Sequence, residues 1–128
     1  MRITPRSYLR LWLGLLFIWT LGLITPGTWF GQATSVKVGE VGVAKILHFS
    51  IYAGLAGSAG WLPLPRFWRL IIALPLLSAH GALTEVAQLL VPAREGCVRD
   101  WMIDTAGIVL GLAITWRWWP KDSAAGTR

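Results

Sequence analysis

Four long apolar runs constrain the fold of this 128-residue chain more than any other feature. They cover residues 9–24, 43–62, 70–91 and 100–119, and each approaches the roughly 20 residues that a helix needs to cross a bilayer. Charged residues make up 14% of the chain, against roughly 25% in soluble domains. We therefore expect an all-α fold, a bundle of four transmembrane helices that forms a single membrane domain over residues 1–128.

The segments between these runs contain residues that interrupt helices. Residues 25–42 are rich in glycine and proline, and Pro63 and Pro65 open a short basic connection. Pro75 predicts a kink inside the third run. Residues 120–128 are polar and predict a flexible tail.

The basic N-terminus followed by an apolar run also fits a signal peptide. Residues 31–33 (GQA) form a poor cleavage site, and Trp12 and Trp19 are bulky for such a segment. We favour a retained first helix. The other three helices keep their orientation under either interpretation.

The net charge of +6 is scattered between apolar runs, so it indicates membrane topology and not nucleic-acid binding. Eight basic residues fall on the side of both termini: Arg2, Arg6, Arg10, Arg66, Arg69, Arg117, Lys121 and Arg128. Four fall on the opposite side: Lys37, Lys45, Arg94 and Arg99. Because positive residues concentrate in cytoplasmic segments, we expect both termini in the cytoplasm. Five tryptophans should line the inner interface: Trp61, Trp68, Trp116, Trp118 and Trp119.

Polar residues interrupt three of the runs at one predicted depth, within roughly 10 Å of the outer boundary. They are Lys45 and His48 in the second run, Glu85 and Gln88 in the third, and Asp100 and Asp104 in the fourth. Tyr52 shares the helical face of Lys45 and His48. Within each run the spacing places them on one helical face. Arg94 and Arg99 can fold over them from the connecting loop. Ionisable groups inside a membrane are costly and usually functional, so we predict a ligand-binding site there.

Simpler roles are open for single residues. Asp100 fits a helix cap as well as a site residue, since a negative charge is favourable at a helix N-terminus. Tyr52 is more often a packing residue, and His80 more often bonds to a neighbouring helix. Cys97 excludes an intramolecular disulfide and is otherwise an ordinary loop residue. Gly107 and Gly111 have GxxxG spacing, which favours a close helix contact.

The order and spacing of the polar residues resemble the VanZ-like family of small bacterial membrane proteins. The resemblance covers residues 43–111 and rests on four motifs: Lys45-x-x-His48-Phe49-x-x-Tyr52, Glu85-x-x-Gln88, Val91-Pro92-x-Arg94 and Asp100-x-x-x-Asp104-Thr105-x-Gly107. It implies a multi-pass helical protein of the bacterial inner membrane. The founding member is associated with low-level resistance to the glycopeptide antibiotic teicoplanin, which acts on the outer face.

Three positions depart from the family pattern. Ala44 stands where an acidic residue is common, Cys97 where a small polar residue is common, and Asp104 where asparagine is frequent. The first change removes one partner of Lys45, and the third adds a carboxyl group. Resistance itself is not transferred to this protein.

The first functional hypothesis is binding or modulation of an amphipathic envelope molecule, a lipid or lipid-linked cell-wall precursor, at the outer leaflet. Cationic residues would contact its phosphate or carboxylate: Lys45, His48, Arg94 and Arg99. Acidic and amide residues would orient those cations or accept hydrogen bonds: Glu85, Gln88, Asp100 and Asp104.

The alternative is a small intramembrane enzyme on the same kind of molecule, with Glu85 as general base and His48 as acid. A variant has His48, Glu85, Asp100 and Asp104 holding a divalent cation, but their spacing is not diagnostic, so we expect no metal and no cofactor. An ion pathway is disfavoured because the polar residues cluster at one side. The small residues would also permit a helix partner or a homo-oligomer.

Overall fold

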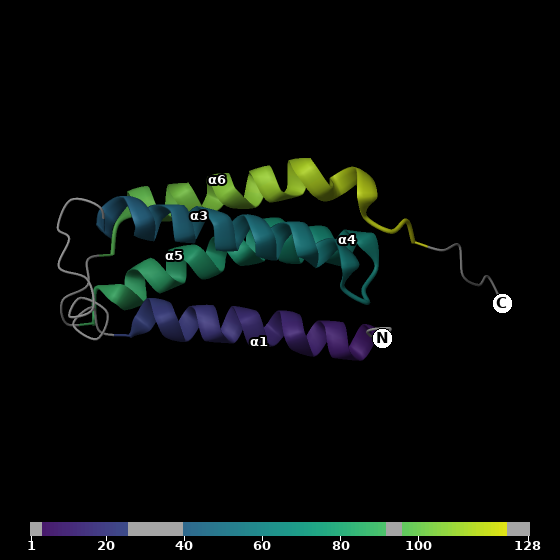
Figure 1. Cartoon of the computed structure of the whole chain (residues 1–128), viewed down its shortest axis with the longest axis horizontal. Coiled ribbons are helices and arrows are strands. Elements are labelled where there is room, and N and C mark those ends of the chain that lie inside the picture. The colour runs from purple at the N-terminus through teal and green to yellow at the C-terminus, as the bar shows by residue number, and fades with distance from the viewer. Residues whose placement is uncertain (1–3, 26–39, 92–95, 123–128) are drawn as a thin grey trace.

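The computed structural model describes residues 4–25, 40–91 and 96–122, which form a bundle of helices (Figure 1). The elements are α1 (Pro5–Ile24), α3 (Glu40–Ser58), η1 (Ala59–Trp61), α4 (Arg66–Ile71), η2 (Ile72–Leu76), α5 (Leu77–Gln88), α6 (Val98–Thr115) and η3 (Trp116–Trp118). The described part of the chain contains no strand, so the all-α prediction is confirmed.

In the described part of the chain, two helices are long and apolar enough to cross a membrane, Pro5–Ile24 and Arg66–Gln88. The second is α4, η2 and α5 joined end to end. The interruption predicted at Pro75 takes the form of the π-helical turn η2. Proline has no N–H to donate, and a wider turn lets the helix continue past it.

Local interactions place two helix ends differently from the sequence prediction. Helix α1 begins at Pro5 because the Oγ1 atom of Thr4 accepts a hydrogen bond from the backbone N–H of Ser7 at 3.2 Å. Helix α6 begins at Val98, with Cys97 as an extended N-cap residue. Asp100 therefore lies in the first turn of α6, where its charge suits the helix dipole, and its side chain does not cap the helix.

The helices alternate in direction (Figure 1). Helices α1 and α5 finish where α3 and α6 begin, and we call this the distal end of the bundle. The first residue of α1 and the last turn of α6 lie at the opposite end, which we call the terminal end. The antiparallel arrangement brings the N-terminal turns of α3 and α6 beside the last turns of α5.

Helices α3 and α6 meet through the predicted GxxxG pair. A Cβ atom on Gly107 would lie 2.3 Å from the carbonyl oxygen of Phe49, and one on Gly111 would lie 2.1 Å from that of Ala53. Both oxygens belong to backbone that has no room to retreat. The two backbones can touch only because position 107 and position 111 carry no side chain, so the predicted close contact is confirmed within the chain.

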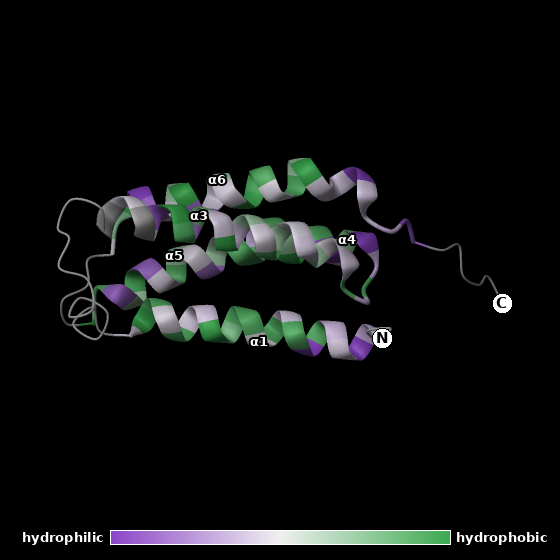
Figure 2. Ribbon diagram, viewed as in Figure 1, coloured by the Kyte–Doolittle hydropathy of each residue, from purple (hydrophilic) through white to green (hydrophobic). Residues whose placement is uncertain are grey.

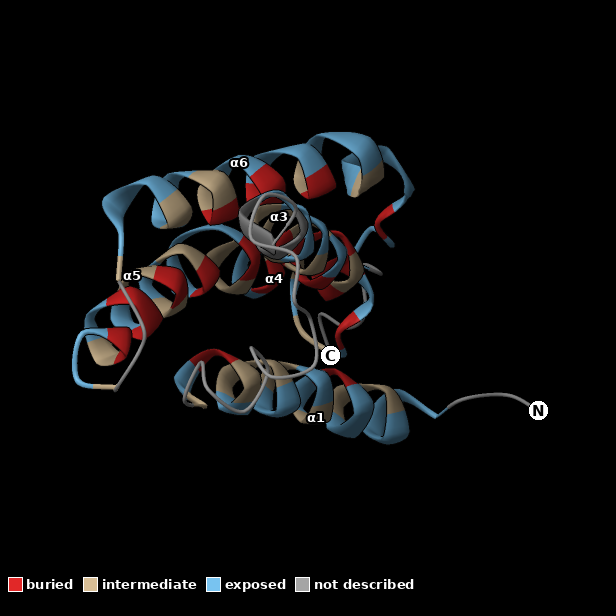
Figure 3. Cartoon of the chain, turned by 60° about the vertical axis from the view of Figure 1, so that its left-hand side comes forward, coloured by how far each residue is buried: buried red, intermediate tan, exposed pale blue. Residues whose placement is uncertain are grey.

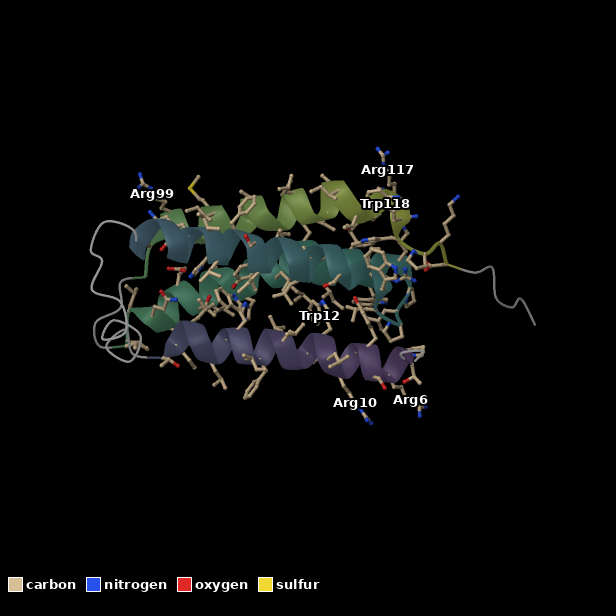
Figure 4. All side chains as sticks on the ribbon, viewed as in Figure 1. Arg6, Arg10, Trp12, Arg99, Arg117 and Trp118 are labelled. Carbon is tan, nitrogen blue, oxygen red and sulfur yellow. The ribbon has the colours of Figure 1, made fainter. Side chains whose placement is uncertain are left out.

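Aromatic hydrogen bonds attach α1 to α3. The indole N–H of Trp12 donates to the carbonyl oxygen of Leu55 at 3.1 Å, and the Tyr8 hydroxyl donates to that of Ser58 at 2.7 Å. Trp12 is buried and points into the bundle (Figure 4). Helix α1 is thus held by specific contacts, although most of its own surface is exposed (Figure 3).

The outer surface is largely apolar, and much of the polar material is inside. Large exposed apolar side chains run along α1, α5 and α6, as the hydropathy colouring shows (Figure 2). Among the residues that the structure describes, five polar or charged ones are buried: Arg69, Thr84, Glu85, Gln88 and Asp104. This distribution is the reverse of that in a soluble domain, and it indicates a membrane protein.

One interfacial prediction was wrong. Trp119 is 2% exposed, and its indole N–H donates to the carbonyl oxygen of Gly57 at 3.1 Å. A Cβ atom on Gly60 would collide with this ring, so the glycine creates the space that Trp119 fills. The other four tryptophans of the predicted inner belt are exposed.

Arg69 joins the segment that follows η3 to the short connection before α4. Its guanidinium donates to the carbonyl oxygens of Leu64, Gly60 and Pro120, and it pairs with Asp122 at 3.1 Å. The side chain is buried, so these carbonyls depend on it for their partner.

Arg69→Gln should therefore lower the stability of the folded bundle by about 2 kcal/mol or more, since buried carbonyls lose a charged donor. The measurement is unfolding in mixed detergent micelles followed by circular dichroism. Arg117→Gln is the control, because Arg117 is exposed and points away from the bundle (Figure 4). Equal stability of the two variants would contradict this role of Arg69.

Candidate polar site

Three ionisable side chains from three helices converge near the distal end, and we call them the polar cluster. They are His48 from α3, Glu85 from α5 and Asp104 from α6. Nδ1 of His48 lies 2.9 Å from Oδ1 of Asp104. One potential ligand atom from each residue lies within 4.8 Å of the other two. The structure thus brings three of the predicted site residues together from α3, α5 and α6.

The cluster contains buried oxygens without a protein partner. Oε2 of Glu85 accepts a hydrogen bond from the backbone N–H of Cys97 at 2.8 Å. Oε1 of Glu85 and Oδ2 of Asp104 are buried and have no hydrogen-bond partner among the described residues. The same holds for Nε2 of Gln88. A buried polar atom without a partner costs about 1–3 kcal/mol, so these atoms favour a further molecule or ion at the cluster.

Two glycines allow the carboxyl groups to sit where they do. A Cβ atom on Gly81 would lie 3.1 Å from Oδ2 of Asp104, and one on Gly96 would lie 2.0 Å from the carbonyl oxygen of Glu85. Gly81 thus leaves the free oxygen of Asp104 uncrowded. Gly96 lets the segment before α6 pass against α5, which brings the N–H of Cys97 to Glu85.

A second set of hydrogen bonds lies beside the cluster and reaches α1. The Tyr52 hydroxyl is 2.9 Å from Nδ1 of His80, and Nε2 of His80 is 2.9 Å from the hydroxyl of Thr20. The Trp19 ring packs edge-on against His48, with 5.3 Å between ring centroids. His80 therefore bonds to two neighbouring helices, and Tyr52 is fully buried.

The remaining predicted residues lie farther out or outside the described chain. Lys45 is half-buried in the second turn of α3, and Asp100 is half-buried in the first turn of α6. Arg99 is exposed and points away from the bundle (Figure 4). Arg94 lies outside the described residues. Ligand contacts by these four residues remain predictions.

An apolar pocket of about 220 Å³ on the surface of the bundle borders Glu85 of the cluster. It lies between α5 and the start of α6 and is lined by Ala82, Glu85, Val86, Leu89, Gly96, Cys97, Val98 and Trp101. Among the described residues that line it, Glu85 is the only ionisable one apart from the Cys97 thiol. The pocket thus offers an apolar surface beside one carboxyl group.

Sequence reasoning did not place Trp19, Thr20, Gly81 or Gly96 near the site. Gly81 lies one turn before Glu85, and Gly96 directly precedes Cys97, but a lone glycine gives no indication of what approaches it. The residues of α1 are distant in sequence from the motifs. Only the packing of α1 against α3 and α5 shows that Trp19 and Thr20 line this region.

The geometry allows two kinds of chemistry. A hydrogen-bonded imidazole and carboxyl group next to a second carboxyl group can accept hydrogen bonds and transfer protons. The same donor set can hold a divalent cation, since carboxylates and imidazole are both ligands of such ions. Asp100 is not among the three grouped residues.

Comparison with known proteins identifies one family. The sequence model of the family described as VanZ/LLP1 matches residues 6–119, which include all the described helices except the first residue of α1. No curated protein and no solved structure matches the chain.

Proposed function

The chain belongs to the VanZ/LLP1 family, and from that premise we propose that it binds an amphipathic lipid or lipid-linked envelope molecule at the outer leaflet. The observation that carries the proposal is the apolar pocket on the surface of the bundle, which has Glu85 in its wall. An acyl or prenyl chain would pack against the apolar walls. Polar groups of the head would reach the buried oxygens of Glu85 and Asp104.

The proposal requires the distal end to face outward. In it, all four long helices span the bacterial inner membrane and both termini are cytoplasmic. The described cations support this orientation, since Arg6, Arg10 and Arg117 lie at the terminal end and Arg99 at the distal end (Figure 4). Lys45 and Arg99 would then stand near the phosphate or carboxylate of the head group.

The alternative is an enzyme that acts on such a molecule. The 2.9 Å bond between His48 and Asp104 is the observation in its favour, because a carboxylate partner orients an imidazole for proton transfer. Glu85 would be the base and His48 the acid. Binding and catalysis share the same site, and they differ in what becomes of the bound molecule.

Filling the pocket tests the proposal without altering the polar cluster. Val86 lines the pocket and is 60% exposed, and Val86→Trp should displace the apolar chain. Val109→Trp is the matched control, because Val109 is 52% exposed on α6 and does not line the pocket. Lipids that co-purify in native nanodiscs are identified by mass spectrometry. We expect one lipid class to be enriched with the wild type and with the control. Val86→Trp should capture at least about tenfold less of that lipid, which corresponds to a loss of roughly 1.4 kcal/mol in binding free energy.

Bulk lipid alone in the wild type would overturn the proposal. An enriched class that Val86→Trp retains would overturn the assignment of the pocket. Both variants are checked for intact helix content, so that a folding defect is recognised.

A further inference from the structure

We propose that the polar cluster is a binding site for one divalent transition-metal cation, held by His48, Glu85 and Asp104. The site adds a function to the same region, but it does not depend on lipid binding. It rests on the donor set, the unpartnered oxygens and the way neighbouring groups constrain them.

The donor set is the first argument. One imidazole nitrogen and two carboxylate oxygens within 4.8 Å of one another come from three different helices. Around a zinc-sized ion, donors at about 2.0–2.2 Å lie roughly 3–3.5 Å apart. Nδ1 of His48 now lies 2.9 Å from Oδ1 of Asp104 in a hydrogen bond, and coordination of the ion by Nδ1 would replace that bond.

The buried oxygens of the two carboxyl groups also favour a bound cation. Asp104 is 0% exposed and Glu85 is 6% exposed, and each has one oxygen without a partner among the described residues. If both carboxyl groups were ionised at this separation, they would repel each other. One protonated imidazole carries a single positive charge and does not neutralise both. A divalent cation supplies the missing partner for both free oxygens and offsets the negative charge in one step.

Neighbouring groups leave one oxygen of each carboxyl group accessible to the ion. The N–H of Cys97 holds Oε2 of Glu85 and leaves Oε1 for the ion. Gly81 keeps the space beside Oδ2 of Asp104 free of a side chain. Hydrogen bonds of this kind fix the orientation of ligating carboxylates in metal sites. The fourth and later ligands would be water or a ligand group.

The ligand types indicate the class of ion. One imidazole with two carboxylates suits Mn²⁺, Fe²⁺ or Zn²⁺ better than Mg²⁺ or Ca²⁺, which favour oxygen ligands alone. Affinity should follow the usual order for divalent ions, with Zn²⁺ bound more tightly than Mn²⁺. The charge of Asp104 is important for cation affinity, because an asparagine at this position would supply only a neutral oxygen.

The test is metal binding by the full-length, tag-free protein in detergent without added lipid, after treatment with a chelator. A Cys97→Ser background removes the exposed thiol, and its backbone N–H is retained. Titration calorimetry with Zn²⁺, Mn²⁺ and Mg²⁺ should show about one equivalent of Zn²⁺, with weaker Mn²⁺ and negligible Mg²⁺. Asp104→Asn and Glu85→Gln should each weaken Zn²⁺ binding at least about 100-fold. Asp100→Asn should change it less than threefold, because Asp100 is not in the group.

Pulsed electron paramagnetic resonance of the Cu²⁺-loaded wild type makes the test independent of variant folding. It should detect one coordinated imidazole nitrogen, and His48→Gln should remove that signal while His80→Gln keeps it. Absence of stoichiometric binding by the wild type, or Zn²⁺ binding that persists in both carboxyl variants, would overturn the metal site. Neither result affects the pocket experiment with Val86→Trp, which leaves all three ligands in place.

Discussion

Gly111→Ala should destabilise the bundle by about 3 kcal/mol, the upper end of the cost of overpacking. The added methyl group would lie 2.1 Å from the carbonyl oxygen of Ala53, and the nearest atoms belong to backbone. The helices must therefore separate, and the contact that places His48 beside Asp104 is disturbed along with them. Reversible unfolding in mixed micelles, followed by circular dichroism, measures the effect.

Gly54→Ala is the matched control for this prediction. Gly54 lies on α3, is exposed, and has no heavy atom within 4 Å of where a Cβ atom would stand. Alanine is the better helix former by about 1 kcal/mol, so the control should be neutral or slightly stabilising. Equal effects of the two substitutions would contradict the α3–α6 interface described above.

Glu85→Gln should reduce the amount of enriched lipid captured in native nanodiscs by about tenfold to 100-fold. A hydrogen bond to a charged group is worth about 1.5–3 kcal/mol, and the amide keeps the size of the side chain while losing its charge. Quantitative lipid mass spectrometry measures the ratio. Arg117→Gln is the control, since it removes a charge at the terminal end, far from the polar cluster, and it should change capture less than twofold.

The same variant separates binding from catalysis. An enzyme with Glu85 as its base would retain the lipid in Glu85→Gln and no longer convert it. Retention with loss of a product found in the wild type therefore favours the enzyme. Retention with no product in either protein contradicts a role for Glu85 in holding the head group.

The sequence predicted the parts of the structure that depend on local chemistry. Apolar run length predicted the helices, and GxxxG spacing predicted the contact at Gly107 and Gly111. Helical periodicity also placed His48, Glu85 and Asp104 on faces that could meet. Helical periodicity gives only the face on which a residue lies and its distance along the helix. It could not show that Asp104, and not Asp100, lies beside His48 and Glu85.

Other features depend on contacts between distant segments. Trp119 was predicted at the interface because tryptophan is common there, yet the space beside Gly60 lets it pack inside. The approach of Trp19 and Thr20 to the site requires α1 to pack on α3 and α5. No pattern in residues 5–24 indicates the face that does so. The grouping of three potential ligands likewise depends on how three helices rotate against one another.

The central claim is that the polar cluster lies at the outer face of a four-span bundle, and Cys97 tests it most directly. Cys97 is the sole cysteine of the chain, its side chain is exposed, and its N–H contacts Glu85. The measurement is labelling with a membrane-impermeant maleimide in intact spheroplasts, before and after permeabilisation. We expect full labelling of Cys97 from outside, before permeabilisation. Labelling only after permeabilisation would place the cluster at the cytoplasmic face and contradict the proposed outer-leaflet site.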